Sequence, residues 1–144
     1  MPYCLVVEDS LEVRHVLCQL LTELGHHPLE ADGPASAVDI CKTIAPPIIF
    51  LDWDMPDFGA LELLRVMPTY QVRPQIVLCM ARNDPRELAL AKAAGASLQM
   101  MKPFDKASVL RALERVECAL KANGMEAGPE LPAVDAYGER LVAT

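Results

Sequence analysis

The sequence has no apolar run long enough to cross a membrane, although 52% of its 144 residues are hydrophobic. It does not begin with a basic stretch followed by a long apolar one, so we expect no signal peptide. Positive charge is scarce as well, because 13 Lys and Arg stand against 20 Asp and Glu, a net charge of −7. This balance argues against a nucleic-acid backbone as the main partner, although it leaves room for a local basic patch. We therefore expect a cytoplasmic domain that binds neither membrane nor nucleic acid.

Cysteine pairs with metal-ligand spacing are also missing. The five cysteines are odd in number and scattered: Cys4, Cys18, Cys41, Cys79 and Cys118. Each falls in an apolar stretch, so we expect buried free thiols in a reducing compartment. No internal repeat and no long apolar heptad is evident, which leaves a monomer or a weak dimer open.

Segments with strand and helix periodicity alternate five times. Strands are predicted at Tyr3–Val7, His27–Ala31, Ile48–Leu51, Gln75–Met80 and Leu98–Met101. The first helix carries apolar residues from Val13 to Leu24, between an N-cap at Ser10 and a stop at Gly25; the others are predicted at Ala35–Ile44, Ala60–Met67, Pro85–Ala94 and after a cap at Asp105. Such alternation implies an α/β fold with a doubly wound, five-stranded parallel sheet covered by five helices.

The end of the sequence differs in character. From about Ala122 onward, glycine and proline interrupt any periodicity, as in Asn123-Gly124 and Gly128-Pro129. We therefore expect one domain over residues 1–121 and a flexible C-terminal tail over residues 122–144. At this length we expect no second folded output domain.

Carboxylates follow two of the predicted strands. Asp52 closes the apolar run Ile48–Leu51, and Glu8 and Asp9 come directly after the first strand. In a doubly wound sheet the ligand crevice lies at the carboxyl ends of the strands, where the winding reverses between the first and third strands. Three carboxylates at that place repel one another unless a cation joins them, and hard oxygen ligands suit Mg²⁺.

Each of these residues also has a structural interpretation when it is taken alone. Glu8 and Asp9 would make a polar start to the first helix, favoured by its dipole. Asp52 would cap a turn before Pro56, and Lys102 would be a solvated surface lysine. Their joint occurrence at three strand ends, in this order, favours a functional site.

These motifs resemble the receiver domain of two-component response regulators over about residues 3–120. The motifs are the acidic pair Glu8-Asp9, the segment Asp52-Trp53-Asp54-Met55-Pro56, and Lys102-Pro103-Phe104 after the fifth strand. The single-domain chemotaxis-type regulators are the most similar group. The resemblance implies a flavodoxin-like fold with strand order 2-1-3-4-5. It also implies a stand-alone signalling protein. The peptide bond at the position of Lys102–Pro103 is usually cis in the family, so we expect it to be cis here.

The resemblance implies a role for each site residue. Asp52 would accept a phosphoryl group from the phosphohistidine of a histidine kinase or phosphotransfer protein. Glu8, Asp9, Asp52 and the backbone carbonyl of Asp54 would hold Mg²⁺, and Lys102 would pair with the phosphoryl oxygens. Such a protein is a signalling module that catalyses only its own phosphorylation and dephosphorylation.

Two positions depart from the family pattern. The family usually has Thr or Ser at the end of the fourth strand, and counting back from Gly95 and Lys102 places Met80 there. Counting forward from Pro74 would place Cys79 there instead. That Thr or Ser is one of two switch residues in the family. The other is usually a Tyr or Phe three positions before the lysine, and here that position holds Gln99. The usual coupling between a hydroxyl and an aromatic ring therefore lacks both partners.

The entrance of the predicted crevice departs from the pattern too. Gly59-Ala60 stands where the family often has Asp-Gly, so the loop after Asp52 is expected to differ if that glycine normally has a positive φ. Asp54 and Arg82 occupy positions that tune the lifetime of the phosphoryl group in the family. Their opposite charges suggest a pair across the entrance that limits water access and slows dephosphorylation.

Two functions follow from these residues. In the first, phosphorylation of Asp52 changes the surface of the fourth helix, fifth strand and fifth helix, which then binds an unidentified protein target or passes the phosphoryl group onward. In the second, the chain is a pseudo-receiver that binds partners without phosphorylation, because the loss of both switch residues at Met80 and Gln99 reduces the difference between two states. A non-receiver α/β module, such as a small hydrolase with the same acidic site, is a third possibility.

Overall fold

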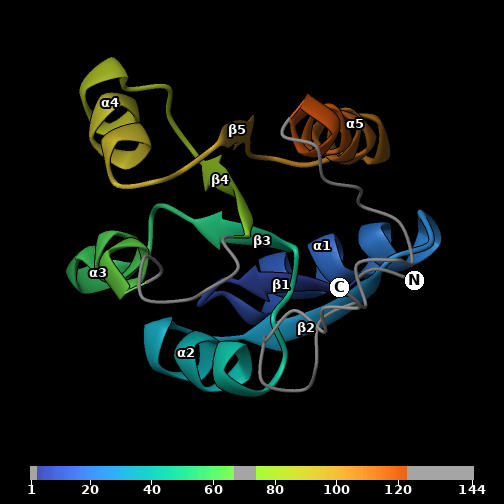
Figure 1. The fold of residues 1–144 in the computed structure, drawn as a ribbon, viewed down its shortest axis with the longest axis horizontal. Helices are drawn as coiled ribbons and strands as arrows, with labels where there is room; N and C mark the ends of the chain where they lie inside the picture. Colours follow the sequence, from blue (N-terminus) through green and yellow to red (C-terminus); the bar gives the residue numbers. More distant parts are fainter. Residues whose placement is uncertain (1–2, 67–73, 123–144) are drawn as a thin grey trace, which may run out of the picture.

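The computed structural model describes residues 3–66 and 74–122, which alternate between strands and helices (Figure 1). The described strands are β1 (Tyr3–Val7), β2 (His27–Ala31), β3 (Ile48–Asp52), β4 (Gln75–Met80) and β5 (Leu98–Met101). The helices are α1 (Leu11–Glu23), α2 (Pro34–Thr43), α3 (Gly59–Val66), α4 (Pro85–Ala93) and α5 (Lys106–Ala122), with a 3₁₀ turn η1 (Pro56–Phe58) before α3.

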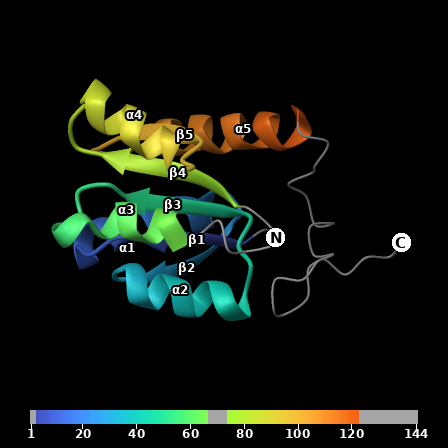
Figure 2. The ribbon, with the colours of Figure 1, turned by 60° about the vertical axis from the view of Figure 1, so that its left-hand side comes forward.

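The strands form one parallel sheet in the order β2-β1-β3-β4-β5 (Figure 2). This confirms the predicted doubly wound sheet and its strand order. In the register of the central strands, Val7 lies beside Leu51 and Asp52 beside Cys79. Because all strands run the same way, the residues that follow β1, β3 and β5 emerge at one edge of the sheet.

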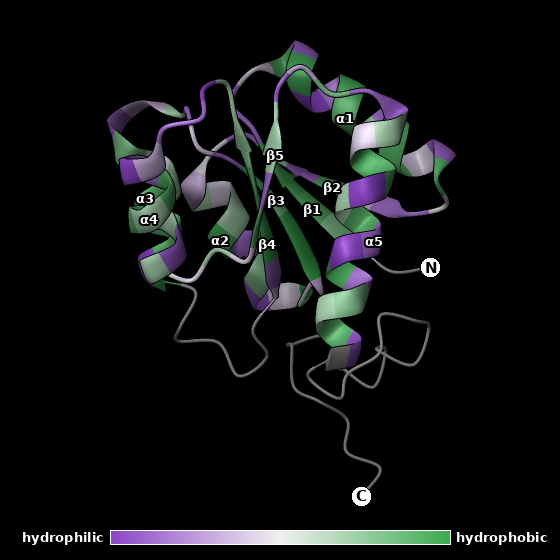
Figure 3. Cartoon of the chain, turned by 90° about the horizontal axis from the view of Figure 1, so that it is seen from above, coloured by the Kyte–Doolittle hydropathy of each residue, from purple (hydrophilic) through white to green (hydrophobic). Residues whose placement is uncertain are grey.

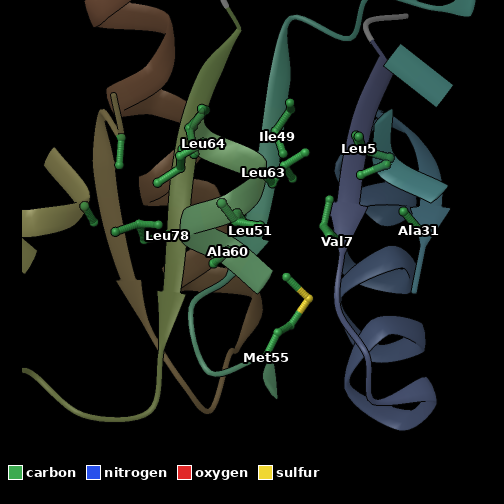
Figure 4. Close-up of a cluster of buried hydrophobic side chains, with 14 of the residues drawn as sticks. Leu5, Val7, Ala31, Ile49, Leu51, Met55, Ala60, Leu63, Leu64 and Leu78 are labelled. Carbon is green, nitrogen blue, oxygen red and sulfur yellow. The ribbon is translucent and has the colours of Figure 1, made fainter. Parts of the chain in front are cut away.

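Helices cover both faces of the sheet: α2, α3 and α4 lie on one side, and α1 and α5 lie on the other (Figure 3). Successive strand residues point to opposite faces. In β3, Leu51 packs in the cluster under α2, α3 and α4, whereas Phe50 packs in the cluster under α1 and α5. Figure 4 shows the first cluster, in which Leu51 lies near Leu63 of α3. Burial on both faces explains why these strands read as continuous apolar runs.

Side-chain caps fix the starts of the helices. The hydroxyl of Ser10 accepts a hydrogen bond from the backbone N–H of Val13 at 3.3 Å, which confirms Ser10 as the N-cap of α1. Asp105 likewise accepts from the N–H of Ser108 at 2.7 Å, ahead of α5. After α1, Gly25 has a φ of 89°, a backbone conformation that suits glycine.

Three helices differ by one residue from the prediction. α2 runs Pro34–Thr43, because proline is suited to the first position of a helix, where the missing N–H costs nothing. α3 begins at Gly59; a Cβ atom there would lie 3.1 Å from Cγ of Pro34, so glycine lets the starts of α2 and α3 approach. The predicted end of this helix, Met67, lies outside the described residues. α4 ends at Ala93, with Ala94 as its C-cap.

The prediction of five buried thiols is correct for four and wrong for Cys118, which is exposed. Cys118 lies in an apolar stretch of α5, but on the side of the helix that faces away from the sheet. The other four cysteines are buried and free.

α5 extends to Ala122, one residue beyond the predicted end of the domain, and the rest of the predicted tail lies outside the described residues. Within residues 3–66 and 74–122, no helix has both the length and the apolar character needed to cross a membrane.

Candidate functional site

Four ionisable side chains meet at the carboxyl edge of the sheet. Glu8 and Asp9 follow β1, Asp52 ends β3, and Lys102 follows β5. One carboxylate oxygen from each of Glu8, Asp9 and Asp52 lies within 4.8 Å of the others. Glu8 and Asp52 are buried, whereas Asp9 is exposed. The structure thus brings together residues from three strand ends that the sequence predicted would converge.

Lys102 is the cation of this cluster. Its Nζ lies 2.7 Å from Oδ1 of Asp52 and 3.2 Å from Oε1 of Glu8. The backbone N–H of Lys102 donates to the carbonyl of Met80 at 2.8 Å, which ties the start of the next loop to β4. The Lys102–Pro103 peptide is cis, as the resemblance implies. Lys102 therefore points toward these carboxylates and is not a solvated surface residue.

Burial, hydrogen bonds and neighbouring charges together shift the pKa values of the cluster. Burial raises the pKa of Glu8 to about 8, and its hydrogen bond with Asp52 and the charge of Asp52 act in the same direction. For Lys102, burial acts against the charged form, but the hydrogen bond and the charge of Asp52 outweigh it and raise the pKa. For Asp9, burial opposes the shift, but hydrogen bonds with Glu8 and Asp52 lower the pKa. A single lysine thus leaves this group of carboxylates short of positive charge.

The donor set fits a hard divalent cation. Three carboxylates supply oxygen ligands of the kind that Mg²⁺ prefers. Burial first, and then the hydrogen bond and the charge of Asp52, raise the pKa of Glu8, so its carboxylate gains from a neighbouring positive charge. A bound Mg²⁺ would supply such a charge.

Asp54 contacts this cluster with both its backbone and its side chain. Its N–H donates to Oδ1 of Asp52 at 2.9 Å. Its carboxylate Oδ2 accepts from the N–H of Ala81 at 2.9 Å and lies 3.7 Å from Nζ of Lys102. The suggested pair between Asp54 and Arg82 does not form, because the Asp54 carboxylate binds these nearer donors; Arg82 is exposed and forms no ion pair within the described part of the chain.

The two unusual positions have different surroundings. Met80, at the end of β4, is 1% exposed and packs in the cluster under α2, α3 and α4, whereas Cys79 points to the opposite cluster. Gln99 is half-buried in β5, and its Nε2 donates to Oδ1 of Asn83 at 3.3 Å. The position of the usual aromatic residue therefore holds a polar link to the loop between β4 and α4.

The sequence prediction missed two of these partners. Ala81 contributes its backbone N–H, and a main-chain donor leaves no signal in the residue type. Asn83 lies in a loop and belongs to none of the sequence motifs, and its hydrogen bond with Gln99 joins positions 16 apart in the chain. The pairing of β3 with β4 brings Asp54 to Ala81, and the pairing of β4 with β5 brings Gln99 to Asn83.

In the loop after Asp52, two residues adopt the left-handed backbone conformation. Asp57 and Phe58 have φ values of 58° and 56°, while Gly59 has an ordinary helical φ of −56°. The loop therefore places its positive φ values on non-glycine residues, which is unusual for a Phe in particular. Phe58 is 83% exposed.

Known proteins resemble this chain in sequence and in fold. The model of a protein family described as the response regulator receiver domain matches residues 4–114. A chemotaxis protein CheY homolog from Campylobacter jejuni is 32% identical over 117 residues, which cover 78% of this chain and 89% of that protein. The phosphate regulon transcriptional regulatory protein PhoB from Klebsiella pneumoniae is 28% identical over 114 residues, and the match covers 78% of this chain but only half of PhoB. The structure of chemotaxis protein CheY4 from Vibrio cholerae superposes with a TM-score of 0.74 at 25% identity, covering 81% of this chain and 98% of CheY4.

Proposed function

This chain belongs to the response regulator receiver family, and from that premise we propose that it accepts a phosphoryl group on Asp52 and signals through protein contacts. The observation that supports this best is the position of Lys102, whose Nζ lies 2.7 Å from Oδ1 of Asp52 inside a cluster of three carboxylates. An ammonium held against a buried carboxylate at the carboxyl edge of a parallel sheet suits phosphoryl transfer to that carboxylate.

Asp52 is held ready to act as the nucleophile. Its side chain is 2% exposed, and Oδ1 accepts hydrogen bonds from the N–H of Asp54 and from Lys102. A carboxylate oxygen of Asp52 forms the new bond to phosphorus while the bond from phosphorus to the donor histidine nitrogen breaks. The resulting acyl phosphate is then open to hydrolysis by water, so the domain catalyses only its own phosphorylation and dephosphorylation.

The residues that surround Asp52 divide the remaining work. Glu8, Asp9 and Asp52, with the backbone carbonyl of Asp54, would hold Mg²⁺. When bound, that ion offsets negative charge on the transferring phosphoryl group. Lys102 pairs with phosphoryl oxygens and keeps its positive charge throughout, because its pKa is raised.

The partners we propose are proteins. A histidine kinase or a phosphotransfer protein supplies the phosphoryl group, and an unidentified protein target receives the signal from a monomer or weak dimer. The surface of α4, β5 and α5 is suited to such contacts, because Leu90, Met101 and Leu110 are exposed there.

A phosphorylation-independent interaction module is the second candidate. Met80 offers no hydroxyl to a phosphoryl group, and Gln99 is already bonded to Asn83. Without a hydroxyl that moves and a ring that turns, phosphorylation has fewer contacts through which to favour a second conformation.

Phosphorylation of the purified protein separates these two functions. The protein is incubated with Mg²⁺ and acetyl phosphate, beside the Asp52→Asn variant and the control Asp39→Asn, which alters an exposed aspartate of α2. Intact mass spectrometry should detect a phosphoryl adduct in the wild type and the control but not in Asp52→Asn. Amide exchange in β4 and β5 then reports whether the conformation changes. If neither acetyl phosphate nor a cognate kinase produces an adduct, the proposal fails and the interaction module is favoured.

A further inference from the structure

The carboxylate of Asp54 lies at a point where two donors from different strands converge. Its Oδ2 accepts from the N–H of Ala81, after β4, at 2.9 Å. The same oxygen is 3.7 Å from Nζ of Lys102, which follows β5. One anionic oxygen of the chain itself therefore sits between a backbone amide and an ammonium.

This point is directly next to the proposed acceptor. Nζ of Lys102 is also 2.7 Å from Oδ1 of Asp52, so a phosphoryl group on Asp52 would place its anionic oxygens beside this lysine. Oxygens that carry negative charge bind most strongly to an ammonium and to unshared backbone N–H groups. The position held by Asp54 is therefore the one that a phosphoryl oxygen would need.

Among the described residues near Asp52, other backbone donors are already bonded to buried groups. The N–H of Trp53 donates to the carbonyl of Cys79 at 3.0 Å, and the N–H of Asp54 donates to Asp52. Met80, at the end of β4, carries no hydroxyl. The side chain that accepts from Asp54 is the buried Asp52, whereas the side chain that accepts from the N–H of Ala81 is the partly exposed Asp54.

We propose that Asp54 is a resident competitor of the phosphoryl group: its carboxylate fills the anion position between Ala81 and Lys102 and must move out before Asp52 is phosphorylated. This inference rests on the proposed function of Asp52. The Asp54 side chain is 41% exposed, so it can turn into solvent without disturbing the core. Displacement is required because a phosphoryl group and a carboxylate would otherwise share one donor and repel each other.

Binding of inorganic phosphate tests this without relying on covalent chemistry. We would titrate phosphate, with and without Mg²⁺, into the wild type, Asp54→Ala, Asp54→Asn and the control Asp39→Asn. The Ala81 amide resonance in ¹⁵N NMR spectra reports both the loss of Asp54 and the arrival of the anion. Removal of Asp54 should tighten phosphate binding about tenfold, which is the scale of one partly exposed charge-assisted hydrogen bond. The phosphate affinity of Asp54→Asn should lie between those of the wild type and Asp54→Ala, because its amide oxygen still accepts from Ala81 but carries no charge.

The initial rate of labelling by acetyl phosphate is the second measurement, and it should rise by a similar factor in Asp54→Ala. The inference is overturned if phosphate affinity in Asp54→Ala stays within twofold of the Asp39→Asn control, or if phosphate leaves the Ala81 resonance unmoved in every variant. Absence of labelling in all variants, even with a cognate kinase, would instead refute the acceptor role of Asp52. The phosphate titration decides the competitor role in either case.

Discussion

Replacement of Met80 by threonine should reveal what this protein gains by lacking the usual hydroxyl. Met80 is 1% exposed and packs with Leu51, Met55 and Leu78 in the cluster under α2, α3 and α4. Full burial of a methionine side chain is worth about 1.5–3 kcal/mol. Threonine is smaller, so it leaves a cavity, and it places a hydroxyl against apolar neighbours at a further cost of about 1–3 kcal/mol if it finds no partner.

We expect Met80→Thr to lower the free energy of unfolding by about 3 kcal/mol. Met80→Leu is the matched control, because a swap that keeps volume and polarity costs less than about 1.5 kcal/mol. Urea unfolding followed by circular dichroism measures both values in the absence of Mg²⁺ and phosphodonor. If the free energy of unfolding falls with urea concentration at the wild-type slope in both variants, the difference lies in stability and not in the unfolded state.

A threonine variant as stable as the leucine variant would refute the reasoning. It would mean that the site already accommodates a hydroxyl, so that Met80 has no packing role that excludes one. If the stability loss is found, amide exchange in β4 and β5 after phosphorylation tests whether the restored hydroxyl also restores a conformational response.

Three further predictions follow from the surroundings of single residues. Among the cysteines of the described segments, Cys118 should be labelled rapidly by a thiol reagent at pH 8, whereas burial raises the pKa of Cys4 to about 12 and should delay its labelling until the protein unfolds; equal labelling rates would contradict the packing of β1. Burial lowers the pKa of His26, so the folded state binds fewer protons than the unfolded state. The stability from this residue is present above the ordinary histidine pKa and is lost as pH falls from that value through the lowered pKa of the folded state. The free energy of unfolding, measured from pH 5.5 to 7.5, should therefore depend less steeply on pH in His26→Gln than in the wild type. The same pH dependence in both proteins would show no such linkage. Ser10→Ala should cost about 1 kcal/mol of stability, because the N–H of Val13 loses its side-chain acceptor; thermal melting measures this loss, and an unchanged melting temperature would mean that water replaces the cap.

The order of elements was predictable because local patterns specify it. The apolar run that ends at Asp52 is buried on both faces, and Ser10 caps α1 through a contact only three residues away. Of the three one-residue errors, those at α2 and α3 lie where the approach of Gly59 to Pro34 links two helices that are distant in sequence. The exposure of Cys118 was also missed, because an apolar neighbourhood in the sequence does not say which side of a helix meets the sheet.

The sequence by itself determined that Glu8, Asp9, Asp52 and Lys102 would meet, because parallel strands deliver their carboxyl ends to one edge of the sheet. Only the tertiary structure decided what Asp54 binds. Charge suggested Arg82, but the carboxylate takes the N–H of Ala81 and lies near Lys102. A backbone donor carries no signature in the residue type, and which donor is nearest depends on how the loops after β3, β4 and β5 pack against one another.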